Sequence, residues 1–350
     1  MMKIGKFTDF YRDVTKEGTK IPQEKYLQSG RYPVIDQGRQ AVAGRWDSND
    51  GIFEKVPAII FGDHTRAIKY IEEPFFIGAD GVKILRPVNS KDNPKYLYYA
   101  LQAARIPDLG YSRHFKVVKE LEIRVYSTEE QDEIVRILEK IDHLIEQRHA
   151  EIDFLDQLVK SRFIELFGDP VINPLGWTKR ALGTVCDVRD GTHDSPEYYE
   201  TGYPLVTSKN VTGGHIDLTT CNFISEDAYN QINARSKVDK GDIIMPMIGT
   251  VGNPVIVDVE PTFAIKNVAL IKFPTQSLVK NIYIRALLQS DYFDRAVISK
   301  VRGGTQKFIA LGDIRKLEIL IPDSDTQEQF AAFVEQTDKS KLYGEMEVAA

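Results

Sequence analysis

Apolar residues recur at alternating steps of four and three between residues 128 and 167, and no Pro or Gly interrupts them. Ser127 followed by Glu130 is the pattern of a capping box at a helix start. This spacing is typical of a helix whose apolar seam faces a second helix. Forty residues at about 1.5 Å each give a length of about 60 Å, so we predict a long spacer helix in preference to an ordinary core helix. Its seam residues are Ile134, Leu138, Ile141, Ile145, Ile152, Leu155, Val159 and Leu166.

A second segment repeats the start of this helix. Residues 326–334 resemble residues 130–138, and Phe330 and Val334 continue the apolar pattern. Two helices with matching seams bury them best against each other. We therefore expect the two to pack antiparallel, which would bring the chain ends together and hold the flanking domains at a fixed separation.

The second helix is shorter than the first. Its pattern fades after Lys341, and its apolar seam is lost beyond Thr337. This indicates either a truncated segment or a shortened natural form in which two chains complement each other. In both cases we expect an exposed seam over residues 141–166, and with it self-association or dependence on a partner chain.

The sequence outside these helices forms an internal repeat. Pairs of segments correspond in the same order, and in each half a β-like run and a helix start follow them. The loops between these anchors differ most, which suits two readers of different targets because loops carry recognition. Duplication followed by drift is the simpler alternative. The pairs are 30–35 and 202–206, 57–63 and 241–246, 78–85 and 264–271, 96–102 and 282–289, and 110–115 and 303–308.

Short β-branched runs bounded by Gly, Pro and Asp predict strands in both halves. The fold class we predict is α+β, with two repeated mixed α/β domains separated by long coiled-coil-forming α-helices. The expected strands are 56–61, 81–85, 242–245, 254–259 and 316–321, and the expected helices lie near 94–104 and 279–290. The expected boundaries are 1–127 for the first domain, 128–167 for the spacer helix, 168–322 for the second domain and 323–350 for the second helix.

The composition is that of an ordinary globular protein, with 42% hydrophobic and 27% charged residues. Only Cys186 and Cys221 occur, which excludes a disulfide framework and a cysteine-rich zinc site. No apolar stretch resembles a signal peptide or reaches the ~20 residues that span a bilayer. We therefore expect a soluble, cytoplasmic protein.

The net charge of −6 argues against a nucleic-acid partner only until it is divided by segment. Residues 1–127 hold 21 Lys and Arg against 16 Asp and Glu, a net of +5, and residues 168–322 hold 17 of each. The two predicted helices carry the excess acid, with 5 against 11 in residues 128–167 and 2 against 7 in residues 323–350. Attraction to phosphate depends on the local potential, so the net charge of the whole chain neither supports nor excludes a nucleic-acid partner.

Motifs of common enzyme chemistries are missing. The sequence has no Gly-rich phosphate loop and no dinucleotide fingerprint, and its six His residues lack metal-ligand spacing. An adenine methyltransferase would need a Gly-rich cofactor loop and an Asn-Pro-Pro-aromatic pocket. Residues 173–176 (Asn-Pro-Leu-Gly) come nearest, but they lack the second Pro and the aromatic residue. We therefore expect a non-catalytic chain that holds no metal or cofactor itself.

Several motifs carry a resemblance to a known family. Residues 167–170 (Phe-Gly-Asp-Pro) and 173–177 (Asn-Pro-Leu-Gly-Trp) stand where the spacer enters the second domain. Residues 190–196 (Asp-Gly-Thr-His-Asp-Ser-Pro) lead to 202–210 (Gly-Tyr-Pro-Leu-Val-Thr-Ser-Lys-Asn), and 303–308 (Gly-Gly-Thr-Gln-Lys-Phe) form a closing turn. With the domain–helix–domain–helix order, the chain resembles, over essentially its whole length, the specificity subunit of type I restriction–modification systems.

The resemblance implies a role in defence against foreign DNA. Each target recognition domain would read one half of a split double-stranded DNA target, while the helices set the gap and dock two methyltransferase subunits. Adenine methylation, and cleavage with ATP-driven translocation by restriction subunits, would belong to the partners. S-adenosylmethionine, ATP and Mg would then bind in those subunits rather than in this chain.

Base reading favours Arg, Lys, Gln and Asn on projecting loops, whereas hydroxyls and backbone amides more often hold phosphates. On this basis we expect DNA contacts in both domains, with residues 39–45 and 302–307 as the leading clusters. The first-domain candidates are Gln37, Arg39, Gln40 and Arg45 in a strand-free stretch, with Asp63, His64, Thr65, Arg66, Tyr111, Ser112, Arg113 and His114. The second-domain candidates are Thr192, His193, Ser195, Ser208, Lys209, Asn210, Thr250, Arg302, Thr305, Gln306 and Lys307.

Two other classes of function stay open at this point. A free-standing interaction or inhibitor module could use the duplicated fold to bind protein, and it would show no affinity for DNA. An enzyme with an unrecognised site, such as a nuclease, would show metal-dependent turnover by the purified chain.

Overall fold

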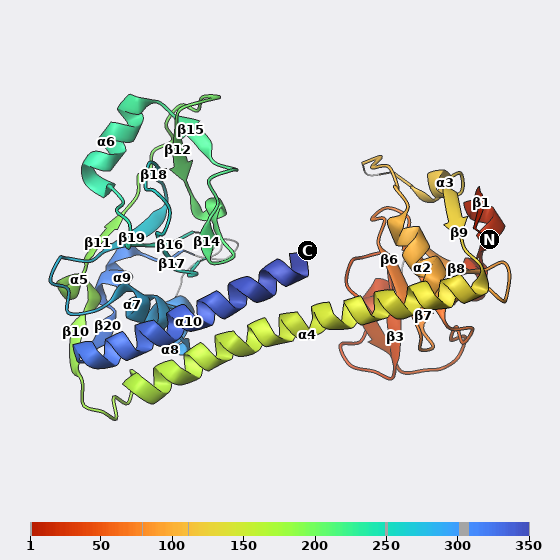
Figure 1. The fold of residues 1–350 in the computed structure, drawn as a ribbon, viewed down its shortest axis with the longest axis horizontal. Helices are drawn as coiled ribbons and strands as arrows, with labels where there is room; N and C mark the ends of the chain where they lie inside the picture. Colours follow the sequence, from red (N-terminus) through yellow and green to blue (C-terminus); the bar gives the residue numbers. More distant parts are fainter. Residues whose placement is uncertain (1, 79, 111, 249–250, 301–307, 350) are drawn as a thin grey trace. The chain divides into compact units, whose positions relative to one another are not determined.

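The computed structural model describes residues 2–78, 80–110, 112–248, 251–300 and 308–349. The chain divides into two compact units, Met1–Ile145 and Glu146–Ala350. The helix α4 (Thr128–Phe167) contributes residues to both units (Figure 1). Its bounds match the predicted spacer helix. In the expected capping box, the Ser127 N–H donates to the Glu130 carboxylate at 3.0 Å and the Glu130 N–H donates to the Ser127 hydroxyl at 3.4 Å.

The first unit contains a four-stranded sheet in the order β2-β8-β5-β6, a three-stranded sheet in the order β4-β3-β7 and the pair β1-β9. β3 and β7 run parallel, and the other neighbours run antiparallel. The strands are β1 (Lys3–Lys6), β2 (Tyr11–Asp13), β3 (Tyr32–Ile35), β4 (Gly44–Trp46), β5 (Ala58–Gly62), β6 (Ile68–Ile71), β7 (Phe76–Ile77), β8 (Val82–Pro87) and β9 (Glu122–Val125). The helices are α1 (Phe7–Phe10), η1 (Thr15–Glu17), η2 (Gln23–Lys25), α2 (Pro94–Ala103) and α3 (Phe115–Val118).

The second unit repeats this arrangement with the sheets β11-β19-β16-β17 and β15-β12-β18 and the pair β10-β20, and it adds the hairpin β13-β14. The strands are β10 (Thr178–Ala181), β11 (Asp187–Asp190), β12 (Tyr203–Val206), β13 (Val211–Thr212), β14 (His215–Ile216), β15 (Asn222–Ile224), β16 (Ile243–Pro246), β17 (Val255–Ile256), β18 (Ala264–Ile265), β19 (Val268–Lys272) and β20 (Glu318–Ile321). The helices are α5 (Leu182–Val185), η3 (Ser208–Asn210), α6 (Glu226–Ser236), α7 (Asn281–Leu288), α8 (Asp291–Ala296), η4 (Ile298–Lys300), α9 (Leu311–Lys316) and α10 (Ser324–Ala349).

The predicted repeat is confirmed in the register of the sheets. Ile59 of β5 pairs with Leu85 of β8, and Ile243 of β16 pairs with Ile271 of β19, as the correspondence of 57–63 with 241–246 and of 78–85 with 264–271 requires. The match fails before Val82. Phe76–Ile77 are the residues paired with β3, as Ala264–Ile265 are with β12, so the loop before β8 is longer than the loop before β19.

The predicted strand at 316–321 is wrong at its start. Lys316 ends α9, and β20 begins only at Glu318. Apolar residues alternate from residue 317 onward, which suggests an earlier start for the strand, but Leu317 is the C-cap residue of α9. The predicted strand at 254–259 is likewise shorter in the structure, where β17 covers Val255–Ile256.

The apolar core of the second unit contains the end of α4 and the start of α10. The rings of Phe163 and Phe167 pack against Phe330 with centroid distances of 5.8 and 5.2 Å, and Phe163 stacks on Tyr283 of α7 at 5.6 Å. In the first unit, Val135 of α4 is buried in the core formed by α2 and the four-stranded sheet. Each domain therefore shares its core with a long helix.

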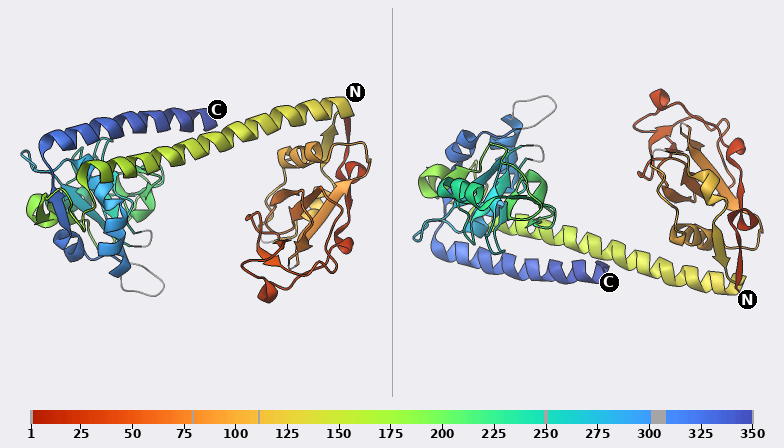
Figure 2. Two further views of the ribbon diagram at one scale, coloured as in Figure 1. Left: turned by 90° about the horizontal axis from the view of Figure 1, so that it is seen from below. Right: turned by 90° about the horizontal axis from the view of Figure 1, so that it is seen from above.

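The two long helices run antiparallel within the second unit, as predicted. Arg162 lies over the ring of Phe333 at 5.9 Å, and further along the pair Lys341 donates to Asp156. A methyl group added at Gly344 would lie 3.5 Å from Ile152. Figure 2 shows α10 alongside the same stretch of α4 from two sides.

Two expectations about the second helix are wrong. The helix does not fade after Lys341, because α10 continues to Ala349. The seam from Ile152 to Leu166 is not exposed either: Ile152, Leu155, Val159 and Leu166 are half-buried beside α10. Exposure of a predicted seam position is confirmed at Ile141, which is 45% exposed.

Candidate nucleic-acid interface

Loops of the first domain meet at Gln37, which follows β3. Its Oε1 accepts a hydrogen bond from the His64 backbone N–H, and its Nε2 donates to the Asp80 carbonyl, both at 3.2 Å. The Thr65 hydroxyl donates to the Gln37 carbonyl. Since His64 and Thr65 follow β5 and Asp80 follows β7, one residue joins the loops that leave three strands.

Asp63 and His114 form the buried floor of this loop cluster, at 4% and 1% exposure. The Phe115 N–H donates to the Asp63 carboxylate at 2.7 Å, and the Leu109 N–H donates to His114 Nε2 at 3.2 Å. Because Nε2 accepts, the imidazole proton is on Nδ1, which lies 2.9 Å from the Asp63 carbonyl oxygen. These two predicted residues therefore hold the loops in place in this conformation.

Arg66 connects the same cluster to the segment after α2. Its guanidinium donates to the Asp108 carboxylate at 2.7 Å and to the Ile106 carbonyl at 3.4 Å. Its backbone has a φ of 61°, in the left-handed region that bulky residues rarely adopt. The strained turn thus places a cation at the edge of the cluster.

Other predicted residues of the first domain project from this framework. Arg39, Gln40, Ser112 and Arg113 are exposed. The prediction that Arg45 lies in a strand-free stretch is wrong, since it belongs to β4, where it pairs with Pro33. The pairing is non-local and left no alternation in the polar sequence around it. Tyr111 lies outside the described residues.

The second domain gathers polar groups around Lys266 and Asn267, which follow β18. The Thr192 N–H donates to the Ile265 carbonyl and the Asn267 N–H to the Thr192 carbonyl, at 3.0 and 3.1 Å. Lys266 Nζ donates to the Ser195 hydroxyl at 2.6 Å. The 190–196 loop is therefore fixed by the turn between β18 and β19.

His193 is held at both ring nitrogens. Nδ1 lies 2.8 Å from Asn267 Oδ1, and Nε2 lies 2.9 Å from the Asp190 carboxylate, which also accepts from Arg235. Hydrogen bonds to Asn267 and to Asp190 raise the pKa of His193 above its ordinary 6.5. The imidazole is 57% exposed, so a surface cation stands at this loop when the ring is protonated.

The turn after β12 is organised by Asn210, which is 3% exposed. Its Oδ1 accepts from the Thr207 N–H at 2.9 Å, and Ser208 Oγ lies 3.5 Å from the Asn267 carbonyl. Lys209 is exposed. Of the three residues predicted here, Asn210 supports the turn, Ser208 joins it to the Asn267 cluster and Lys209 projects.

Some predicted residues of the second domain fall on parts of the chain that the structure does not describe. Residues 249–250 and 301–307 are among them, and so is most of the predicted closing turn. The predicted residues concerned are Thr250, Arg302, Thr305, Gln306 and Lys307.

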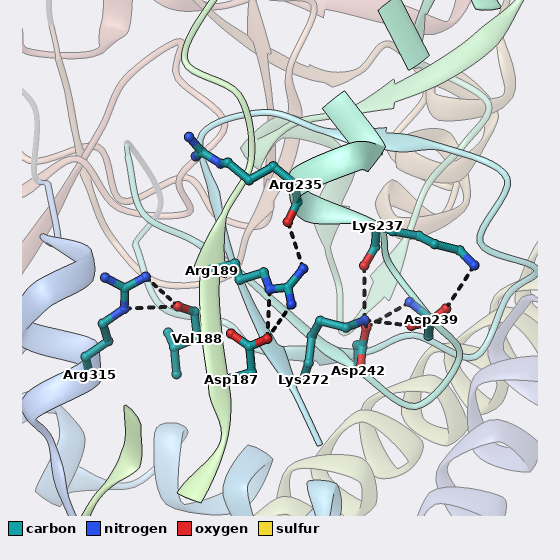
Figure 3. Close-up of polar contacts among 9 residues, drawn as sticks. All are labelled: Asp187, Val188, Arg189, Arg235, Lys237, Asp239, Asp242, Lys272 and Arg315. Carbon is teal, nitrogen blue, oxygen red and sulfur yellow. Dashed lines mark hydrogen bonds and ion pairs between the residues drawn. The ribbon is translucent and has the colours of Figure 1, made fainter. Parts of the chain in front are cut away.

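A polar network that includes Arg189, the residue before Asp190, was not predicted (Figure 3). Arg189 donates to Asp187 at 2.5 Å and to the carbonyl of Arg235 at 2.8 Å. Lys272 donates to Asp239 and to the buried Asp242 at 2.7 and 2.6 Å. The network ties the end of α6 to the edge strand β11, and it ties the loop before β16 to the end of β19. It thereby fixes Asp190, the next residue along β11 and the acceptor for His193.

Sequence reasoning missed Asp190, Arg235, Lys266 and Asn267 as members of the second cluster. Asn267 carried a signal, because Asn is the residue after Gly that best tolerates the left-handed region, and its φ is 57°. Asp190 opened a motif that the sequence had already singled out. The ion pair of Arg235 with Asp190 joins residues far apart in sequence and left no local trace.

The two clusters share part of their place in the repeat. In each domain two of the loops leave the parallel strand pair, β3 and β7 in one and β12 and β18 in the other. The third loop follows β5 in the first domain and β11 in the second. The sequence profile of the family described as type I restriction modification DNA specificity domain matches residues 2–153 and 174–345. The chain belongs to this family. Both matched regions contain one loop cluster, so each cluster belongs to one specificity domain.

Individual relatives are more distant. The chain is 25% identical over 242 residues to the type I restriction enzyme MjaVIII specificity subunit of Methanocaldococcus jannaschii, covering 64% of this chain and 56% of that protein. It is 23% identical to the EcoR124I/EcoR124II specificity subunit of Escherichia coli, covering 96% and 86%. The chain thus spans only a little over half of the first relative's length.

Solved structures share the fold of this specificity-domain chain. The S subunit of a type I restriction–modification system from M. genitalium matches with a TM-score of 0.56 and 18% identity, over 100% of this chain and 92% of that one. A structure described as the basis of complex assembly and conformational transition of the type I system matches with a TM-score of 0.55 and 17% identity, over 99% and 94%.

Two features are absent from the described ranges. No helix there is both long and apolar enough to cross a membrane. No group of three or more His, Cys, Asp and Glu side chains in the same ranges is placed to hold a metal ion.

Proposed function

We propose that this chain is a sequence-specific DNA-binding specificity subunit of a type I restriction–modification complex. Each domain reads one half of a bipartite DNA target through its loop cluster. The observation that carries the proposal is that each of the two specificity domains presents a polar loop cluster beside the same parallel strand pair, with different side chains in the two clusters. Gln37 joins the loops of the first and Asn267 those of the second, which suits two half-sites of different sequence.

The exposed groups of each cluster suit DNA. Arg39 and Lys209 project as cations, which gain affinity by neutralising phosphates and releasing counterions. Gln40 offers an amide of the kind that reads adenine in the major groove. Buried residues such as Asp63 and Asn210 hold the loops that present these groups, which limits the entropy lost on binding.

In this proposal, catalysis resides in partner subunits. The long helices α4 and α10 set the gap between the half-sites and dock two methyltransferase subunits, and restriction subunits join that complex. S-adenosylmethionine, ATP and Mg bind in those partners. Exposed apolar side chains on α4, such as Ile137 at 46% and Leu144 at 58%, support a role for this helix as a docking or self-association surface.

Co-expression with the neighbouring methyltransferase subunit tests the proposal. Adenine methylation is mapped across the host genome by single-molecule sequencing. The expected product is a split motif of two short specific halves around a fixed gap, and a palindromic motif would show that two chains each use one domain. A stable complex that adds no new methylation would contradict DNA recognition and favour a protein-interaction module.

A further inference from the structure

Gln131, the fourth residue of α4, has a fully buried side chain, at 0% exposure. Its Oε1 accepts from the Asn93 N–H at 2.7 Å, and its Nε2 donates at 3.0 Å both to the Tyr126 carbonyl and to the Asp92 carboxylate. Asn93 caps the start of α2, and Tyr126 follows β9. One amide therefore joins the last strand of the domain, the start of its helix α2 and the first turns of α4.

Gln327, the fourth residue of α10, makes the same connections in the second domain and is 3% exposed. Its Oε1 accepts from the Lys280 N–H at 2.7 Å, and its Nε2 donates at 3.0 Å to the carbonyls of Pro322 and Leu278. Lys280 precedes α7 and Pro322 follows β20. The two glutamines occupy the same position in the repeat.

A second tie repeats at the same interval. Asp142 and Asp338 each stand eleven residues after the glutamine of their helix. Asp142 accepts from the Tyr99 hydroxyl at 2.5 Å, and Asp338 accepts from Arg285 at 3.0 Å. Tyr99 lies on α2 and Arg285 on α7. In each domain, therefore, one helix contacts the long helix at two positions with the same spacing.

Of the two contacts between each domain and its long helix, the one made by the glutamine is buried. Its amide supplies one acceptor and two donors, and all three are used at both sites. An ionised Glu could accept but not donate, and at Gln131 it would face the Asp92 carboxylate. A Met of similar length would leave every buried partner without its hydrogen bond. No shift of the domain along its helix preserves this set of contacts.

We propose that Gln131 and Gln327 are positioning residues that fix the orientation of each recognition domain on its own long helix and thereby set how strictly the complex discriminates gap length. The proposal rests on the proposed function. The glutamines take no part in reading bases, because they lie with α2 and α7 and not in the loop clusters. Their loss changes the tolerance for the gap and leaves the preference at each half-site intact.

Hydrogen exchange on the purified full-length chain tests the tie itself, independently of DNA. Gln131→Met is expected to speed amide exchange at the start of α2, and Gln327→Met at the start of α7. The matched controls are Gln147→Met on α4 and Gln329→Met on α10, both at exposed positions. Exchange at these helix starts that equals wild type, in variants that keep their thermal stability, would overturn the positioning role.

Gap discrimination is measured on the complex with methyltransferase. Duplexes carry the two half-sites at the mapped gap or with one base pair added or removed. In Gln131→Met and in Gln131→Glu, preference for the mapped gap should fall roughly fivefold, the ratio expected for about one net hydrogen bond, while single-base changes within a half-site keep their wild-type penalties. A preserved gap preference overturns the gap role alone. Failure of the wild-type complex to bind any split site overturns the proposed function as well.

Discussion

Phe330 of α10 packs edge-to-face against Phe167 of α4, with ring centroids 5.2 Å apart and planes 76° apart. Both rings are fully buried, and Phe163 completes the cluster one turn away on α4. The aromatic cluster is the point at which the chain's two long helices enter one core. The cluster docks α10 on the second domain together with the contacts of Gln327 and Asp338.

We expect Phe330→Ala to destabilise the second unit by about 3–5 kcal/mol, because truncation removes a fully buried ring and leaves a cavity beside Phe163 and Phe167. Phe154→Ala, at a position 61% exposed on α4, is the matched control and should stay within about 0.5 kcal/mol. Chemical unfolding measures the change in stability of each variant, and hydrogen exchange in α10 of the folded variants shows whether the helix stays docked. Equal losses in the two variants would show that the cluster does not hold the helices together.

The scaffold was predictable because its signals are local. Uninterrupted heptad spacing predicted α4 with both of its ends. Apolar runs predicted strands at β5, β8 and β16, and the predicted correspondence between the repeats agrees with the pairing of Ile59 with Leu85 and of Ile243 with Ile271. The extension of α10 past Lys341 was missed because its sequence lacks a seam there. The contact of Lys341 with Asp156 shows that α10 stays beside α4 there, and no apolar pattern indicated it.

The candidate site was predictable only as residue types on loops. Asp63 and His114 were chosen as polar loop residues, but their contact joins loops far apart in sequence, and burial gives them a supporting role. Asn210 is also buried and has a supporting role, although its side-chain hydrogen bonds are local, to Thr207 and Thr220. No local pattern distinguishes a side chain that faces solvent from one that turns inward to bond a distant backbone group.

Asp63→Ala should destabilise the first domain by about 1–3 kcal/mol, since it leaves the buried Phe115 N–H without its acceptor. Asp63→Asn should lose less, because an amide oxygen can replace the carboxylate oxygen. Thermal unfolding compares both with Asp50→Ala at an exposed position. An alanine variant as stable as Asp50→Ala would assign the buried carboxylate no part in holding the loops.

The imidazole of His193 should titrate above 6.5, since hydrogen bonds to Asn267 and Asp190 favour its protonated form. A folded-state pKa above the unfolded one means that the contribution to stability is complete below about pH 6.5. It is lost as the pH rises through the folded-state pKa. NMR titration should show the His193 pKa falling in Asn267→Ala. Coincident titration curves for wild type and variant would mean that Asn267 does not hold the ring.

Arg39→Ala and Lys209→Ala should each weaken DNA binding without lowering thermal stability, because both side chains are exposed. If each contacts one phosphate, the slope of log affinity against log salt should fall in magnitude by about 0.9 per variant. If a side chain reads a base instead, the loss should be confined to one half-site, at about 1–3 kcal/mol for the matching base. Lys160→Ala on the exposed side of α4 is the control. Unchanged affinity in both loop variants would mean that Arg39 and Lys209 do not contact DNA, and would assign the interface to other exposed cations of each domain.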